Sequence, residues 1–139
     1  MGTTTRQQMR DLIRAHVKAE GAGNVDGAVA PYTDDIVHDV VGYPGGPLHG
    51  IDAARAFYTN LTANIRTEEE VPTHVLQGDD FTVLDQMMTA TVTGSFLGIQ
   101  GNGRRVRFRI LHVFEFRNER ICRENVWLDS NAIVHQLSA

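Results

Sequence analysis

The stretch from Ser95 to Ser138 reads SFLGIQGNGRRVRFRILHVFEFRNERICRENVWLDSNAIVHQLS and decides the fold. Its middle alternates strictly between two rows of side chains. One row is almost entirely apolar and consists of Val106, Phe108, Ile110, His112, Phe114 and Phe116. The other row begins with Arg105, Arg107 and Arg109. This period of two predicts a strand over Arg104–Arg117 with one buried side and one solvent-facing side.

Three further strands surround this one. Arg120–Leu128 follows the turn Asn118-Glu119, and Val71–Leu76 and Phe81–Phe96 come before it, joined at the turn Gly78-Asp79-Asp80. Together the four segments predict an antiparallel meander. We expect a terminal helical turn at Asn131–Leu137.

Helical patterns dominate the first half of the chain. From Thr3 to Glu20 the apolar side chains recur at the spacing of an amphipathic helix, and His16 belongs to this apolar row. A second short helix is predicted at Val25–Tyr32, where Pro31 should end or kink it. The apolar spacing within Ile51–Ile65 predicts a third helix.

Helices that come first and a meander that comes later indicate the α+β class. We expect a single domain over residues 1–139, in which three N-terminal helices pack on a curved, cone-shaped antiparallel sheet. Ile36–Val41 should add a strand, and the glycine- and proline-rich segment Gly42–Gly50 a loop. Gly94 and Gly98 are candidate kinks for the curvature. Such a cone would enclose a mostly apolar pocket.

Composition and charge narrow the class of function. The net charge of −4 argues against a nucleic-acid partner, because a phosphate-binding surface needs a basic excess. Cys122, the single cysteine, cannot form an intramolecular disulfide, which favours a reducing compartment. The first residues lack the apolar core of a signal peptide, and no apolar run is long enough to span a membrane. We therefore expect a cytoplasmic protein without a membrane partner.

Motifs for metal, phosphate or nucleophilic chemistry are not recognisable in the sequence. The six histidines are scattered without the spacing of metal ligands. Pro44 and Pro47 lack the N–H donors that a phosphate-binding loop needs. No serine stands in a nucleophile-elbow motif. We expect neither a metal nor a cofactor.

Two groups of motifs point to a known family. The C-terminal group comprises Phe96-Leu97-Gly98-Ile99, Gly103-Arg104-Arg105-Val106, Ile121, Asp129 and Gln136-Leu137. The earlier group comprises Tyr32-Thr33-Asp34-Asp35, Val41-Gly42, Leu48-His49-Gly50 and Ala56-Phe57-Tyr58. With these motifs the chain resembles the SnoaL-like polyketide cyclases of the nuclear transport factor 2-like (ketosteroid isomerase-like) superfamily. The resemblance covers most of the chain and implies that superfamily's cystatin-like α+β barrel.

The resemblance also implies two candidate general bases. Asp129 matches the aspartate that SnoaL-like cyclases use as acid and base, and loss of hydration beside Trp127 would suit it for proton transfer. A helix N-cap is the alternative role for Asp129. Asp39 occupies the position where the ketosteroid isomerases keep their base. Either the row of Asp39 or the neighbouring row of His38 could face the pocket.

Hydrogen-bond donors are implied in the same way. His112 stands where the isomerases place an acid that donates to the enolate oxygen, although a histidine in an apolar row is equally consistent with a packed core residue. His16 resembles, by position, their tyrosine donor on the first helix, and Asn125 could orient a carbonyl group. The other expected pocket residues are aromatic: Trp127, Tyr32, Tyr43, Tyr58, Phe108 and Phe114.

The expected function is cofactor-independent acid–base catalysis on a small hydrophobic carbonyl compound, as in a polyketide cyclase (intramolecular aldol reaction) or an isomerase. An epoxide hydrolase is one alternative, and it would need Arg123 between Asp129 and Asp39 in the pocket. A non-catalytic small-molecule-binding or dimerisation module is the other, favoured if side chains fill the interior. The resemblance further implies a homodimer through the sheet, which the row of Arg105, Arg107 and Arg109 would oppose unless acids match it.

Overall fold

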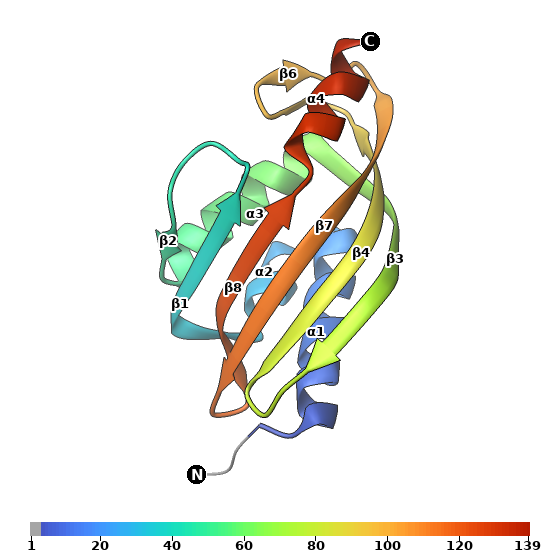
Figure 1. Ribbon diagram of the computed structural model, residues 1–139. Helices are drawn as coiled ribbons and strands as arrows, with labels where there is room; N and C mark the ends of the chain where they lie inside the picture. The colour runs from blue at the N-terminus through green and yellow to red at the C-terminus, as the bar shows by residue number, and fades with distance from the viewer. Residues whose placement is uncertain (1–3) are drawn as a thin grey trace.

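The computed structural model describes residues 4–139, in which helices pack on one side of a curved sheet (Figure 1). The four helices are α1 (Arg6–Gly21), α2 (Val25–Val29), α3 (Ile51–Asn64) and α4 (Ser130–Ser138). The strands are β1 (Tyr32–Val41), β2 (Leu48–His49), β3 (Ile65–Gln77), β4 (Phe81–Val92), β5 (Ser95–Phe96), β6 (Ile99–Gln100), β7 (Arg104–Arg117) and β8 (Arg120–Leu128). The predicted α+β class is confirmed.

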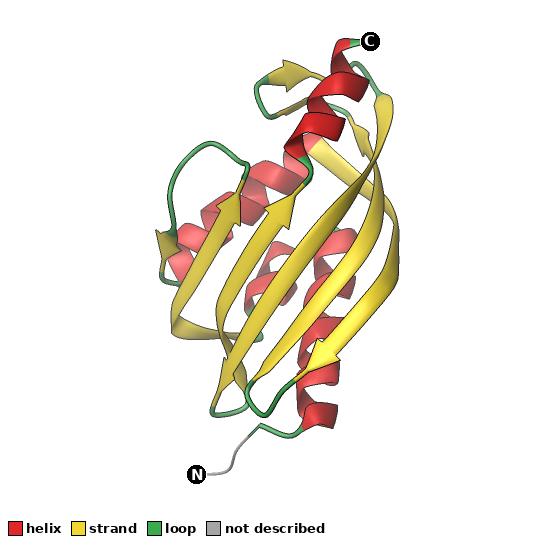
Figure 2. Ribbon diagram, in the orientation of Figure 1, coloured by secondary structure: helices red, strands yellow, loops and turns green. Residues whose placement is uncertain are grey.

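The main sheet has the strand order β2-β1-β8-β7-β4-β3. All neighbouring strands pair in antiparallel orientation except β1 and β8, which pair in parallel. The sheet is strongly curved (Figure 1). The strands β2 and β3 form its opposite edges, so it is not closed into a barrel. Figure 2 shows α1, α2 and α3 covering one face of this sheet and α4 lying at its far end.

The alternation predicted for β7 is confirmed, since its even-numbered residues from Val106 to Phe116 are buried against the helices. Two apolar clusters form the core on this side of the sheet. Phe114 and Phe116 join a cluster with α1 and α2, while Val106, Phe108 and Ile110 join a second cluster with α4. The gap between the two clusters is where polar side chains enter the interior.

Bulges in the strands accompany the sheet's curvature. The pairing of β7 with β8 skips one residue, Cys122, because Ile121 pairs with Phe116 and Arg123 with Glu115. Similar shifts occur in β3, which pairs with β4 over a much longer segment than the predicted Val71–Leu76. An extra residue in one strand bends it and increases its twist. The expected kinks Gly94 and Gly98 lie instead around the small β5–β6 hairpin.

The helices begin where capping side chains place them. Thr5 and Gln8 form a capping box at the start of α1; the predicted start at Thr3 lies outside the described residues. The second helix is shorter than expected and ends at Val29, so that Tyr32 opens β1 instead of closing a helix. The proline at position 31 has no backbone N–H for a longer helix. This early start of β1 turns the Tyr32 side chain into the core.

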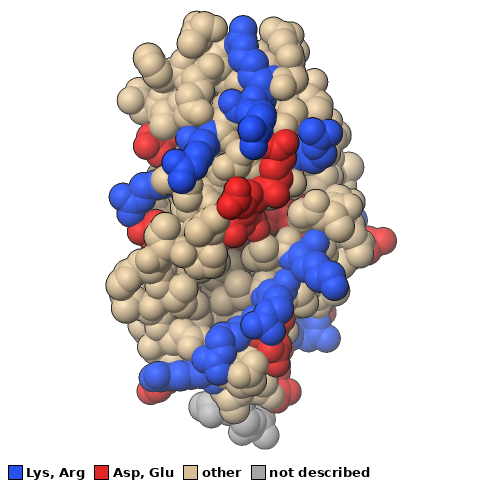
Figure 3. All heavy atoms as spheres, turned by 90° about the vertical axis from the view of Figure 1, so that its right-hand side faces the viewer, with Lys and Arg blue, Asp and Glu red and all other residues tan. Residues whose placement is uncertain are grey.

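The surface carries charges of both signs. Figure 3 shows basic and acidic side chains interleaved on the side of the molecule that contains β3. Within residues 4–139, none of the helices combines the length and apolarity that crossing a membrane requires.

Candidate active site

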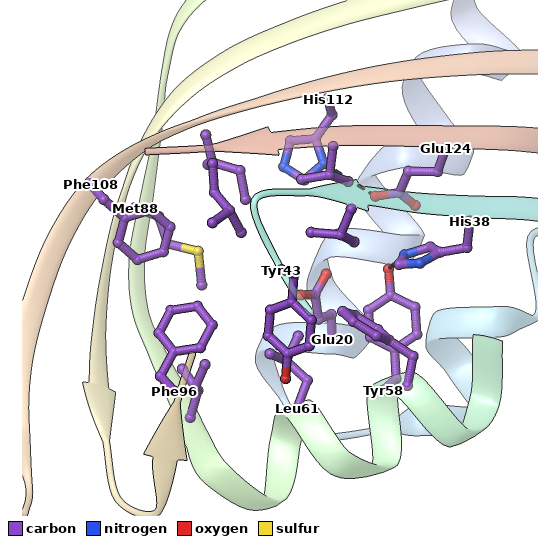
Figure 4. Close-up of a pocket in the computed structure, with 16 residues that line it drawn as sticks. Glu20, His38, Tyr43, Tyr58, Leu61, Met88, Phe96, Phe108, His112 and Glu124 are labelled. Carbon is purple, nitrogen blue, oxygen red and sulfur yellow. Dashed lines mark hydrogen bonds and ion pairs between the residues drawn. The ribbon is translucent and has the colours of Figure 1, made fainter. Parts of the chain in front are cut away.

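A pocket lies between the curved sheet and the helices α1 and α3 (Figure 4). Its walls are mainly aliphatic and aromatic: Val40, Tyr43, Phe57, Leu61, Ile65, Met88, Phe96, Phe108, Ile110, Val126 and Leu128. The polar side chains gather at one end: Glu20, His38, Tyr58, His112 and Glu124. The space that a water-sized sphere can enter is narrow, about 50 Å³.

Glu124 is the centre of the polar end. It projects from β8 and is 1% exposed. Tyr32 donates its hydroxyl hydrogen to Oε1 at 2.5 Å, and His16 Nε2 lies 3.2 Å from the same oxygen. His112 Nδ1 lies 3.1 Å from Oε2. A carboxylate buried this deeply is tolerated only when charges and hydrogen bonds compensate the lost hydration, and three side chains do so here.

His16 supplies the positive charge. Its Nδ1 donates to the carbonyl oxygen of Ala28 at 2.7 Å, which leaves Nε2 toward Glu124. Burial alone would lower the pKa of His16, but the charge and hydrogen bond of Glu124, and the Ala28 carbonyl, raise this pKa to about 9. Burial likewise opposes ionisation of Glu124, yet His16 and His112 hold its pKa well below the usual value. At neutral pH the two groups form a buried ion pair.

His112 has a different arrangement, because one of its nitrogens remains open. An ionised carboxylate can only accept hydrogen bonds, so Nδ1 of His112 must carry the hydrogen that meets Glu124. Nε2 then carries a lone pair in the neutral ring, and it has no hydrogen bond to any of residues 4–139. The ring stacks on Phe114 with centroids 5.4 Å apart and planes 9° apart. The imidazole is therefore fixed on two sides and presents a basic nitrogen to the pocket.

Glu20 adds an acid that can hold a proton near neutral pH. It comes from the end of α1, lines the pocket, and has a side chain 15% exposed. Burial raises its pKa to about 7, although nearby His16, 3.7 Å away, opposes the rise. A carboxylic acid kept neutral by an apolar site can donate a hydrogen bond.

Tyr58 links the remaining polar groups. Its hydroxyl lies 3.0 Å from the Tyr32 hydroxyl, 3.0 Å from His38 Nε2 and 3.3 Å from His16 Nε2. Burial and the nearby Glu124 raise the pKa of Tyr58 well above its usual value, so the phenol stays protonated. Burial lowers the pKa of His38, whose Nδ1 has no hydrogen-bond partner among the described residues. A neutral His38 thus borders the pocket with an unused nitrogen.

Several residues expected from the sequence lie in or beside this pocket. His112, Tyr43, Tyr58 and Phe108 line it. His16 and Tyr32 lie directly behind the lining, where both contact Glu124. Phe114 is fully buried beneath the His112 ring instead of lining the pocket.

The expected position of Asp129 is corrected by the structure. Asp129 is exposed and caps α4, accepting the backbone N–H of Ala132 at 3.1 Å. Trp127, which was expected to desolvate it, is 41% exposed. The bulge at Cys122 is the reason: it shifts the alternation of β8 by one residue, so that Glu124 and Val126 face inward.

Asp39 and Asn125 also lie outside the pocket. On β1 the buried row contains His38, which settles the alternative that the sequence left open. Asp39 points to the opposite face, where Asn125 Nδ2 lies 3.5 Å from its Oδ2. Arg123 belongs to the same outer group and donates to Asn125 Oδ1 at 2.5 Å. Four residues expected at the site, Asp129, Asp39, Asn125 and Trp127, thus face away from it.

Sequence reasoning missed Glu124 and Glu20 and placed no role on His38. Glu124 stands in the row that simple alternation from Ile121 assigns to the solvent side, and no residue type marks the bulge that reverses this. Glu20 is the last polar residue before the glycines that end α1, where a charged side chain usually meets solvent. No signal in the sequence alone reveals the reversal, because the match of Glu124 and Val126 to the even-numbered row of β7 depends on the register that the bulge sets.

Comparison with known proteins gives the family. The model of the SnoaL-like polyketide cyclase family matches residues 10–137, nearly the whole chain. The chain belongs to this family. Among curated proteins, no sequence matches this SnoaL-like chain.

Solved structures support the same fold. TsrD from Streptomyces laurentii superimposes with a TM-score of 0.82 at 17% identity, covering 97% of this chain and 98% of that one. A protein from Jannaschia sp. CCS1, provisionally assigned as a SnoaL-like polyketide cyclase, gives 0.82 at 20% identity and covers 100% and 96% of the two chains. An NTF2-like protein from Burkholderia xenovorans LB400 gives 0.77 at 15% identity, covering 96% and 98%. At these identities the likeness establishes the NTF2-like fold alone.

Proposed function

We propose that this SnoaL-like protein catalyses cofactor-independent proton transfer on a small hydrophobic carbonyl compound, as a cyclase of the intramolecular aldol type or as an isomerase. One observation carries the proposal. His112 is held by Glu124 through Nδ1 and presents Nε2 to an apolar pocket. A neutral imidazole in this position is suited to general base catalysis near neutral pH.

The first step is removal of a proton from the carbon next to a carbonyl group. The C–H bonding pair becomes the enolate, and the proton moves to His112 Nε2. The resulting imidazolium lies against the Glu124 carboxylate, which stabilises the charge without leaving its place. Base catalysis of this kind is worth roughly 10²–10⁴-fold in rate. Glu124 acts here as a positioning residue.

The enolate oxygen needs a hydrogen-bond donor. Glu20 is the candidate, because it lines the same pocket and burial raises its pKa to about 7, which leaves a large protonated fraction at neutral pH. The Tyr58 hydroxyl is a second donor, although His38, Tyr32 and His16 already surround it. One well-placed donor contributes on the order of 10²–10³-fold.

The second step distinguishes the two reactions. In a cyclase, the enolate carbon attacks another carbonyl group of the same substrate, and the new alkoxide takes the proton back from His112. In an isomerase, the same proton returns to a different carbon of the enolate. Both cycles restore the neutral imidazole, so neither consumes a cofactor.

The structure bears differently on the two alternative functions, an epoxide hydrolase and a non-catalytic binding module. The epoxide hydrolase gains no support, because Arg123 lies on the outer face of the sheet instead of between two pocket carboxylates. The binding module keeps one supporting observation, the narrow cavity of about 50 Å³, which is below the several hundred Å³ typical of small-molecule sites. A substrate of ordinary size could bind there only if side chains that line the pocket move.

We also propose a homodimer formed through the outer face of the sheet. The arginine row that could oppose pairing is partly neutralised, since Arg105 Nε lies 2.7 Å from Glu68 and Arg109 lies 2.6 Å from Asp85. On the same face, Trp127 is 41% exposed and Val41 43%. These two apolar side chains are candidates for the centre of the interface.

Exchange of α-protons tests the catalytic proposal without knowledge of the natural substrate. 2-Tetralone in D₂O serves as a probe, and proton NMR follows the loss of its α-hydrogen signals. The protein should accelerate this exchange, and His112→Gln should remove the acceleration, while His74→Gln, at an exposed histidine on β3, should not. Shifts of the protein's NMR signals would report binding of 2-tetralone. If 2-tetralone binds but its α-hydrogens exchange at the uncatalysed rate, the protein is a non-catalytic binding module and the catalytic proposal is wrong.

A further inference from the structure

A second cavity lies on the other side of α1, between this helix and the strands β3 and β4. The space that a water-sized sphere can enter is about 290 Å³, several times that of the pocket described above. No residue of the described range 4–139 lines both cavities. Its walls are apolar, with Ile13 and Val17 from α1, Val75 from β3 and Leu84 from β4. Its size and walls suit a small organic ligand.

A polar group without a partner lies in the floor of this cavity. Gln86 on β4 is 2% exposed, and its Nε2 makes no hydrogen bond with the part of the chain that the structure describes. An amide donor left unsatisfied in the interior is unfavourable, because it has lost its hydration without gaining a partner. Burial raises the pKa of the nearby Glu70 carboxyl, and the side-chain amide of Gln86 opposes this rise. An acceptor on a ligand would satisfy Nε2 after a small rotation of the amide.

The rim of the cavity is basic on the side of α1. Arg10 and Arg14 line it, and they belong to a row at four-residue spacing along the helix that also includes Arg6 and Lys18. Figure 3 views this side of the molecule, where a diagonal row of basic side chains borders a hollow. Arg14 is 74% exposed and its contact with Asp11 is long, at 3.7 Å. It is thus available for a stronger anionic partner.

We propose that the cavity between α1, β3 and β4 is a second ligand site, which binds an amphipathic carboxylate carrying a hydrogen-bond acceptor along its apolar chain. The carboxylate would lie at Arg14 and Arg10, the chain between Val17 and Val75, and the acceptor at Gln86. Glu70 is the only acid in the lining and stands on the opposite wall, on β3. Its raised pKa reduces the negative charge that it presents to such a ligand.

A fluorescent anion tests the apolar wall and the basic rim. 8-Anilinonaphthalene-1-sulfonate should bind, and Arg14→Glu should weaken its affinity roughly three- to tenfold, the range of a surface ion pair that is lost and reversed. Arg107→Glu, on the outer face of the sheet, makes the same change in net charge and should leave the affinity unchanged. N-Phenyl-1-naphthylamine, which lacks the sulfonate, should bind both variants equally. Val75→Glu, at a side chain 50% exposed, should weaken both dyes.

The role of Gln86 is tested with decanoate and its series of oxodecanoates as competitors of the dye. At least one of the oxodecanoates should bind more tightly than decanoate, and Gln86→Leu should abolish this difference in affinity. Because the leucine removes an unsatisfied donor, the same variant should unfold at a denaturant concentration no lower than that of the parent. Nuclear Overhauser contacts from the dye to the methyl groups of Ile13, Val17 and Leu84 are expected. Contacts to Val40 and Leu61 instead, or equal losses in the Arg14 and Arg107 variants, would overturn the proposal.

Discussion

His112 Nδ1 and Glu124 Oε2 lie 3.1 Å apart on neighbouring antiparallel strands, and this pair sets the direction in which the imidazole faces the pocket. Because the carboxylate fixes the hydrogen on Nδ1, it also fixes the lone pair on Nε2. His16 and Tyr32 keep the same carboxylate in place from the other side. The proposed base is thus oriented by a network whose members come from α1, β1, β7 and β8.

Replacing the carboxylate tests this relationship. Glu124→Gln should lower the rate of α-proton exchange by a factor of about 10² or more, because the amide can offer His112 a donor and no longer fixes its tautomer. It should also cost roughly 3–5 kcal/mol of stability, since His16 loses the partner of a buried ion pair. Exchange rates on folded protein and chemical denaturation measure the two effects.

A readout independent of activity separates orientation from stability alone. In the Glu124→Gln variant the pKa of His16 should fall from about 9, as its imidazole resonances would report in an NMR titration. Glu69→Gln, at an exposed position on β3, serves as the matched control and should change neither the pKa of His16 nor the stability of the protein. An unchanged His16 titration would show that Glu124 does not hold the site together.

Asp129 can be assigned by comparing two substitutions. Since its carboxylate caps α4, Asp129→Ala should destabilise the protein by about 0.5–2 kcal/mol, and Asp129→Asn should be nearly neutral because asparagine caps equally well. Both variants should keep the exchange activity. The opposite pattern, with Asp129→Asn stable but inactive, would restore this residue as the catalytic acid and base.

The contrast between Asp129 and His112 illustrates what the sequence could predict. The strict alternation of β7 correctly placed His112 in the buried row, because a long strand without a bulge keeps its phase. In β8 the same reasoning put Asp129 inward and Glu124 outward, since the extra residue at Cys122 leaves no mark in the residue pattern. The error is one residue in register, and it exchanges the two faces of a strand.

The parts of the site that come from helices show a related limit. The apolar row of α1 predicted that His16 faces the core, and it does. Its partner Glu124 follows 108 positions later, so only the tertiary fold brings the charges together. Periodicity predicts which side of an element is buried, whereas the identity of its neighbour depends on sheet order. The parallel pairing of β1 with β8, which places Tyr32 beside Ile121, was not predictable from local pattern.

Stability should decrease as the pH rises from 5 to 9. The pKa of Glu20 is raised from 4.5 to about 7 by burial, so the folded state holds this proton more tightly, and the advantage is lost as the pH rises through 7. His16, raised from 6.5 to about 9, adds a second loss between these values. Glu124 and His38, whose pKa values are lowered, act oppositely: Glu124 only below its ordinary value of 4.5, and His38 below 6.5, where it offsets part of the loss from Glu20. Denaturation curves at successive pH values measure the slope.

Removing the titrating carboxyl should flatten part of this curve. With Glu20→Gln, the decrease between pH 5 and 7 should shrink by roughly 1–3 kcal/mol, at about 1.4 kcal/mol per pH unit of pKa displacement. The decrease above pH 7 should remain, because His16 is still paired with Glu124. Glu69→Gln should leave the whole profile as in the parent protein. If Glu20→Gln leaves the dependence of stability on pH unchanged, a group other than Glu20 causes the decrease between pH 5 and 7.

The proposed dimer makes Trp127 the most sensitive position on the outer face of the sheet. A charge introduced at a side chain 41% exposed should be harmless in a monomer but unfavourable at the centre of an interface. Trp127→Asp should therefore shift the mass measured by light scattering from two chains to one, with unchanged helix content by circular dichroism. Val134→Asp, at a residue 39% exposed on α4, introduces the same charge away from that face and should leave the mass at two chains. A parent protein that elutes as one chain at high concentration would contradict the dimer directly, and equal dissociation by both substitutions would place the interface away from the sheet.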